Sequence, residues 1–191
     1  MKRILAGLFG VLAYSGSVCA DSFDIRLGEE SARFIYASEV FGGAFGPANI
    51  EFGAFFNEDD DTMFHVGLVI KNDSLDNPLA ITLGTRVYYA DAGNAPDQPQ
   101  TDVGAITLGG EILISPDNLG GLGFALSYFA APSVTSFMDA DGFTEYGGRI
   151  EFEVTEQSSL FVGYRKIEVE REDGQTVEID SGVMFGVGLR F

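Results

Sequence analysis

Arginines and carboxylates recur at alternate positions along several extended segments of this sequence. The arginines are Arg26, Arg33, Arg86, Arg149, Arg165 and Arg190, and the acidic residues in phase with them are Glu51, Glu111, Glu151 and Glu153. Arginine presents a rigid fork of donors that suits bidentate pairing with a carboxylate. This pattern fits either a salt-bridged interior or a narrow polar pore lined by alternating charges, and we favour the salt-bridged interior.

His65 is the only histidine, and with a neighbouring serine or carboxylate it could act as a general base. A lipid-modifying enzyme is therefore one hypothesis. Val66 and Gly67 follow it, however, and no His/Ser pair falls on one segment. We favour a hydrogen-bonded interior histidine in the same polar network, and we predict no catalytic residue, no cofactor and no metal ligand.

Acidic residues gather at three expected loops, at positions 58–61, 139–142 and 168–173. The segment Asp139-Ala140-Asp141-Gly142 matches part of a calcium-binding loop, but the remaining ligands are not at the required spacing. We expect solvated loops. The alternative is a surface that binds a ligand, a cation or, through a divalent cation, lipopolysaccharide.

The segments that carry these charges show an alternation with a period of two. Phe64, Val66, Leu68 and Ile70 alternate with His65, Gly67 and Val69, for example. Successive side chains of a strand point to opposite faces, so each segment has one apolar and one polar or small face. The apolar face is similar on every segment, as lipid contact requires. We therefore predict an all-β fold, an antiparallel up-and-down transmembrane β-barrel with the arginines inside.

The final segment, residues 182–191, shows the pattern most clearly. Phe185, Val187, Leu189 and Phe191 are apolar and alternate with glycine or arginine. A terminal aromatic residue suits a membrane interface. The pattern is similar to the C-terminal signal that the bacterial barrel-assembly machinery reads, so we expect that machinery to be a partner during biogenesis.

The first twenty residues have the composition of a secretory signal peptide. Lys2 and Arg3 precede a short apolar stretch, and Val18-Cys19-Ala20 is a small-residue cleavage site. We expect residues 1–20 to be removed and residues 21–191 to form the barrel. The mature chain would keep 9 basic residues against 29 acidic ones, a net charge of −20. This charge excludes nucleic acid as a partner, because no basic patch could neutralise phosphates.

Eight segments between residues 48 and 191 have the strand pattern, and a weaker hairpin precedes them between residues 23 and 37. Bacterial single-chain barrels have even strand numbers, so we predict ten strands, with eight as the alternative. The connections alternate between long and short. We place the long ones outside the cell and both chain ends on the periplasmic side. Eight or ten strands leave little interior space, which argues against a pore for large solutes.

The hairpin around residues 172–174 has a distinct pattern. With Gly174 in the left-handed region, a three-residue loop pairs Val169 with Val177 and Ile167 with Ile179. These apolar residues are out of phase with the lipid-facing ones. We therefore predict a β-bulge, either near residues 164–167 or at residues 181–182.

Three sets of short motifs can be compared with known families. They are Asn57-Glu58-Asp59-Asp60-Asp61 before Val66-Gly67-Leu68, Gly163-Tyr164-Arg165 before Asp173-Gly174, and the final Gly-Val-Gly-Leu-Arg-Phe. Together they resemble the YfaZ family of outer-membrane proteins. The resemblance implies an outer-membrane barrel and supplies no substrate. We expect a monomeric, non-enzymatic barrel of the bacterial outer membrane, with a structural or narrow-pore role and with membrane lipid and lipopolysaccharide as its surroundings.

Overall fold

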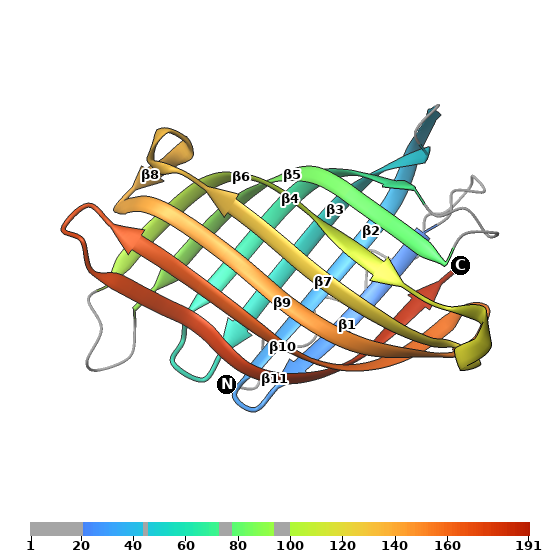
Figure 1. Ribbon diagram of the computed structural model, residues 1–191. Helices are drawn as coiled ribbons and strands as arrows, with labels where there is room; N and C mark the ends of the chain where they lie inside the picture. The colour runs from blue at the N-terminus through green and yellow to red at the C-terminus, as the bar shows by residue number, and fades with distance from the viewer. Residues whose placement is uncertain (1–20, 44–45, 73–77, 94–99) are drawn as a thin grey trace.

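The computed structural model describes residues 21–43, 46–72, 78–93 and 100–191; the expected signal peptide lies outside them. The described residues form one antiparallel sheet that closes into a barrel (Figure 1). Ten strands make its wall: β1 (Asp21–Gly28), β2 (Ser31–Gly43), β3 (Gly46–Asn57), β4 (Thr62–Asn72), β5 (Leu79–Ala92), β6 (Thr101–Ile114), β7 (Leu122–Ala131), β9 (Ala140–Thr155), β10 (Ser158–Arg171) and β11 (Thr176–Arg190).

The predicted count of ten strands is confirmed, and the weaker first hairpin belongs to the wall. The hydrogen-bonded order is β5-β4-β3-β2-β1-β11-β10-β9-β7-β6, and β5 also pairs with β6. The first and last strands meet along Ser22–Gly28, and Asp21 and Phe191 exchange two backbone hydrogen bonds of 2.9 Å. Closure leaves no free sheet edge along this seam, as a membrane barrel requires.

The short elements lie in the connections. A 3-10 turn, η2 (Asp117–Leu119), joins β6 to β7, and η3 (Ser133–Thr135) and β8 (Ser136–Met138) lie between β7 and β9. The strand β8 pairs with the start of β6 and stays outside the ten-strand wall. None of the helical segments in the described residues has the length and hydropathy needed to cross a membrane.

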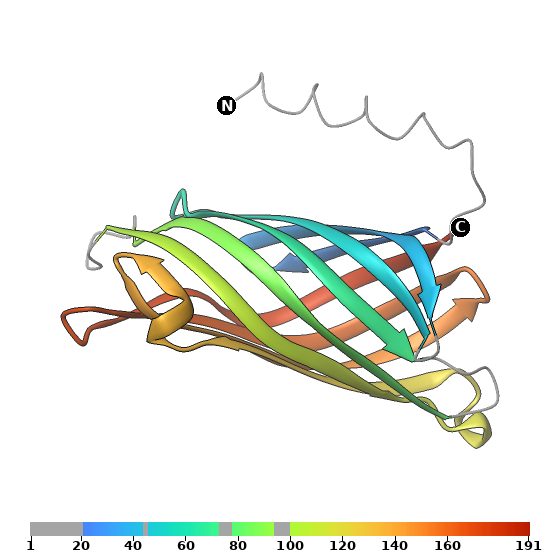
Figure 2. The same ribbon diagram turned by 90° about the horizontal axis from the view of Figure 1, so that it is seen from above.

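The strands are strongly tilted around one axis, and the two ends of the barrel differ (Figures 1 and 2). At one end lie Asp21, Phe191 and the turn between β9 and β10; we call it the hollow end. At the other end, which we call the packed end, the hairpin of β10 and β11 projects beyond its neighbours, close to η3 and β8. The expected alternation of long and short connections is only partly present. The long connection between β7 and β9 lies at the packed end and two residues join β9 to β10 at the hollow end, but two residues also join β1 to β2 at the packed end and seven join β6 to β7 at the hollow end.

Outward-facing residues in the hollow half are those that the alternation predicts. On β10, Leu160, Val162 and Tyr164 are exposed, and on β11 so are Phe185, Val187, Leu189 and, just beyond it, Phe191. In the half nearer the packed end, the tyrosines Tyr89, Tyr128 and Tyr146 lie on the same outer face. An apolar outer belt with aromatic residues toward its border is the pattern of a membrane barrel.

Beyond Tyr164 the polarity of β10 inverts. The outward positions become Lys166, Glu168 and Glu170, while Ile167 and Val169 turn inward and are fully buried. Lys166 Nζ lies 2.8 Å from Glu168 Oε1 and 3.2 Å from Glu178 Oε2 on the neighbouring strand. At the packed end, β10 and β11 are therefore apolar inside and polar outside, the reverse of their arrangement in the hollow half.

A β-bulge on β11 lets that strand follow the same inversion, which on β10 comes from a change of residue type without a change of phase. Val169 pairs with Val177 and Gly174 is left-handed, as predicted, but Ile167 pairs with Asp180, so the predicted Ile167–Ile179 pair is wrong. Ile179 is the extra residue, because the register shifts between Ile167 and Glu168. A bulge was expected near residues 164–167 or at residues 181–182, and the register shift directly after Ile167 lies next to the first of these positions. Ile179 and Asp180 then both face inward, which explains how apolar residues above and polar residues below share one interior.

Candidate functional site in the barrel interior

A charged layer fills the middle of the barrel. Arg33 is fully buried, and its Nη1 and Nη2 atoms donate to Glu145 Oε1 and Oε2 at 2.5 and 3.3 Å. The Tyr88 hydroxyl donates to Glu145 Oε2 at 2.7 Å. Arg33 Nη2 also lies 3.4 Å from His65 Nδ1, and the His65 ring lies 5.1 Å from the Tyr88 ring. This layer crosses the interior, because its members come from β2, β4, β5 and β9.

Two further arginines combine an ion pair with an aromatic face. Arg86 Nε donates to Glu51 Oε2 at 2.8 Å, and its guanidinium lies 3.8 Å from the centre of the Phe129 ring. Arg165 Nε donates to Asp180 Oδ2 at 2.8 Å and its guanidinium lies 5.2 Å from the Phe55 ring. A buried cation needs such partners, since desolvation of an unpaired charge is costly.

Toward the hollow end the charges become more accessible. Arg149 forms a two-point pair with Glu111, in which Nη2 donates to Oε1 at 2.8 Å, and its Nε donates to Glu151 at 3.0 Å. Arg26 pairs with Asp24 at 3.0 Å. The guanidinium groups of Arg26 and Arg149 lie 5.8 and 5.6 Å from the centre of the Phe161 ring.

Arg190 and Glu153 differ from the rest of the predicted network. Their closest charged atoms are 3.5 Å apart, and both side chains are 48% exposed. They lie at the rim of the hollow end, where Arg190 lines the opening and Glu153 does not. Exposed pairs of this kind contribute little to stability because water screens them.

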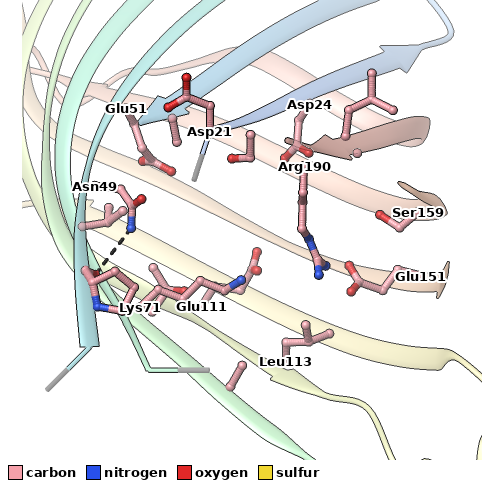
Figure 3. Close-up of a pocket in the computed structure, with 18 of the residues that line it drawn as sticks. Asp21, Asp24, Asn49, Glu51, Lys71, Glu111, Leu113, Glu151, Ser159 and Arg190 are labelled. Carbon is pink, nitrogen blue, oxygen red and sulfur yellow. Dashed lines mark hydrogen bonds between the residues drawn. The ribbon is translucent and has the colours of Figure 1, made fainter. Parts of the chain in front are cut away.

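A cavity of about 450 Å³ opens at the hollow end (Figure 3). Residues from all ten wall strands line it, and Arg86 and Phe129 lie at its deep side. Five basic and six acidic side chains face it. The close-up shows Arg190 extending into this space, with Lys71 on another wall and Asp21 and Asp24 on a third side.

An apolar cluster fills the interior on the other side of the charged layer. Its larger members are Phe55, Met63, Phe143, Ile167, Val169, Val177 and Ile179, all almost fully buried, and small alanines from β5, β6, β7 and β9 complete it. The Tyr88 ring lies 4.6 Å from that of Phe143, which joins the cluster to the charged layer. The interior therefore has three zones: a polar cavity, a charged layer and an apolar cluster, which we call the seal.

A family model described as "YfaZ precursor" matches residues 1–191. The chain belongs to the YfaZ family. The word "precursor" in that description fits the expected signal peptide. No curated protein sequence matches the chain.

Two solved structures are similar to this YfaZ-family barrel. The NanC porin has a TM-score of 0.42 and 14% identity, over 91% of this chain and 98% of that one. The outer membrane channel DcaP of Acinetobacter baumannii has a TM-score of 0.40 and 13% identity. That match covers 88% of this chain, and the chain spans only 62% of the length of DcaP.

The structure of the YfaZ-family chain brings most of the predicted network together and adds three members. Glu145 and Tyr88 complete the charged layer, and Asp180 is the partner of Arg165. The alternation along their strands already places Glu145 and Tyr88 on the inward face, so the sequence could have identified both as members of the network. No comparable signal exists for Asp180, because it faces inward only through the bulge at Ile179.

The acidic loops make specific internal contacts. Asp139 Oδ2 accepts a hydrogen bond from the Asp102 backbone at 3.1 Å, and Asn57 and Asp61 are bonded to each other at the turn between β3 and β4. Among the residues that the structure describes, no group of three or more His, Cys, Asp or Glu side chains has the arrangement of a metal site. Asp61 and Asp139 therefore stabilise the connections in which they lie.

Proposed function

We propose that this YfaZ-family chain is an integral barrel of the bacterial outer membrane whose interior is closed to solutes. The polarity inversion along β10 supports the membrane position. Up to Tyr164 the outer face is apolar and suits hydrocarbon, and from Lys166 onward it is charged and suits water. We place the packed end outside the cell and the hollow end in the periplasm, with lipid and lipopolysaccharide around the belt and the chain as a monomer.

The proposed closure rests on one observation: the charged layer and the apolar seal lie one above the other across the interior. The Arg33–Glu145 layer is buried at the middle, and the apolar seal fills the space above it. An ion would have to enter the apolar seal without its hydration shell, at a large desolvation cost. A structural or binding role is therefore a better explanation than transport, and a narrow pore is the runner-up.

The position of His65 argues against the lipid-modifying alternative. Its side chain is buried in the charged layer, between Arg33 and Tyr88, and does not line the cavity. A general base must come within hydrogen-bond distance of its substrate. We propose that His65 has a structural role in the layer and that the protein is not an enzyme.

Conductance in a planar lipid bilayer tests the closure. The wild-type protein should give no discrete steps, whereas the triple variant Tyr88→Ala, Phe143→Ala, Ile167→Ala should give small steps, because it removes volume from both obstructions. The control Val162→Ala, Val183→Ala, Val187→Ala changes only the outer face and should stay silent.

Each variant must first show the heat-dependent gel mobility of a folded barrel. Discrete steps from the wild type would overturn the closed interior. Silence of the folded triple variant would show that these three side chains do not form the barrier. Extraction from the outer-membrane fraction only by detergent is the result expected for the location, and release by salt or buffer would contradict it.

A further inference from the structure

The cavity at the hollow end has a charge balance unlike that of the whole chain. The complete sequence has 11 basic and 29 acidic residues, a net charge of −18. Five basic and six acidic side chains line the cavity, so its lining is close to neutral. The strands thus concentrate cations in this space, together with nearly as many carboxylates.

The deep part of the cavity is already organised by ion pairs. Glu51 holds Arg86, and Glu111 and Glu151 hold Arg149 from two sides. These side chains are mostly buried, and the flat faces of Phe129 and Phe161 support their guanidinium groups. Such groups are fixed before any ligand arrives, which lowers the entropic cost of binding.

The mouth offers both signs in a more accessible setting. Arg190 is about half exposed and extends into the cavity, and Lys71 lies on another wall (Figure 3). Asp21 and Asp24 line a third side of the same opening. A solute that enters therefore meets cationic and anionic groups within one small space.

The size and the closed inner side of the cavity also favour binding. A volume of about 450 Å³ is within the range of small-molecule sites. This point rests on the proposed closure of the interior: with the charged layer and the seal preventing further passage, a solute enters and leaves only at the hollow end.

The lining discriminates among classes of solute. Six carboxylates would repel a simple anion, and five basic groups would repel a simple cation. An apolar solute would remove water from all of these groups without replacing its hydrogen bonds. A solute with one carboxylate and one ammonium group can satisfy both signs at once. We propose that the cavity is a binding site for small zwitterions of amino-acid or dipeptide size.

Three probes of nearly equal size test this proposal. They are L-alanyl-L-alanine as the zwitterion, its N-acetyl form as the anion and its C-terminal amide as the cation. Titration calorimetry on the full-length mature barrel in zwitterion-free detergent micelles should show binding of the zwitterion about tenfold tighter than of either relative. Equal or weaker binding of the zwitterion, or no binding of any probe, would overturn the proposal.

Two variants locate the site. Arg190→Gln and Lys71→Gln each remove one charge from the mouth, and each should weaken zwitterion binding severalfold while leaving heat-dependent mobility unchanged. Lys166→Gln is the matched control, since it removes one charge from the outer face of the packed half. An unchanged affinity in both mouth variants, or an equal loss in the control, would place binding elsewhere.

The result is separate from the closure of the interior. Calorimetry in micelles needs neither a bilayer nor a pore, so a conducting wild type would leave the binding test intact. Conversely, absence of zwitterion binding would overturn the proposed binding site but would not change the silent bilayer recording. The proposal of a closed interior would then stand.

Discussion

Along β10 and β11, the hollow and packed halves of the barrel have opposite requirements for solvation. In the hollow half, Leu160 and Val162 face outward and Arg149 and Arg26 face inward. In the packed half, Glu168 and Lys166 face outward and Ile167 and Val169 face inward. The first arrangement suits lipid outside and water or ion pairs inside, and the second suits water outside and a dry core. The boundary between them is the charged layer of Arg33 and Glu145.

The largest expected effect comes from breaking that boundary layer. Glu145→Ala leaves Arg33 buried without its partner, and it also removes the acceptor of the Tyr88 hydroxyl. The loss in free energy of unfolding should be about 3–5 kcal/mol. Unfolding in urea from detergent micelles, followed by gel mobility, measures it.

The matched control for this substitution is Glu153→Ala at the rim. Its partner Arg190 is about half exposed, so the expected loss is below about 1 kcal/mol. Equal losses for the two variants would mean that the layer contributes no more than a surface pair.

A charge on the outer face distinguishes the two halves directly. Val162→Arg places a cation in the lipid-facing belt and should cost about 2–4 kcal/mol near the bilayer midplane. Glu168→Arg on the same strand should change stability much less, because its position faces water. Equilibrium folding into lipid vesicles at several urea concentrations compares them. Similar costs at both positions would contradict a membrane border between Tyr164 and Lys166.

A smaller loss in free energy of unfolding is expected at Gly53, where the charged layer packs against the barrel wall. The His65 ring lies directly over Gly53, and a Cβ at that position would overlap the ring. Gly53→Ala should therefore displace His65 and cost about 1–3 kcal/mol. Gly182→Ala is the control, since a Cβ there meets no atom within 4 Å. Chemical shifts of His65 should move in the first variant only, and an unmoved His65 would contradict this packing.

Much of the wall follows from the sequence because alternation is a local property. The inward placement of Arg33, Arg86 and Arg149, and the outward placement of Phe185 and Val187, need only the strand period. The choice of partner is different. Arg33 and Glu145 are 112 residues apart and meet across the interior, which depends on the closure and stagger of the whole barrel. The residue pattern along one strand does not show which residue of a distant strand its arginine will meet.

The inverted polarity of the packed half could be inferred only in part. The apolar residues of the hairpin were visibly out of phase, and this mismatch predicted a bulge. The position of the bulge depends on which residue can remain unpaired between the strands, and this residue is Ile179. The Ile179 carbonyl accepts a hydrogen bond from Asn57 Nδ2 at 3.2 Å. Asn57 lies on β3, so the contact that accompanies the bulge comes from a distant part of the sequence.

The bulge at Ile179 makes β11 unequally sensitive to changes of length. Deleting that single residue would make Glu178 and Asp180 neighbours on opposite faces, so Val177 would stay inward and the dry core would lose only the Ile179 side chain. An added residue on the far side of Asp180 would instead turn Phe185 and Val187 from the bilayer toward the ion pairs. Relatives that share this architecture should therefore vary freely in the loop at Gly174 and conserve the number of residues between Asp180 and Phe185.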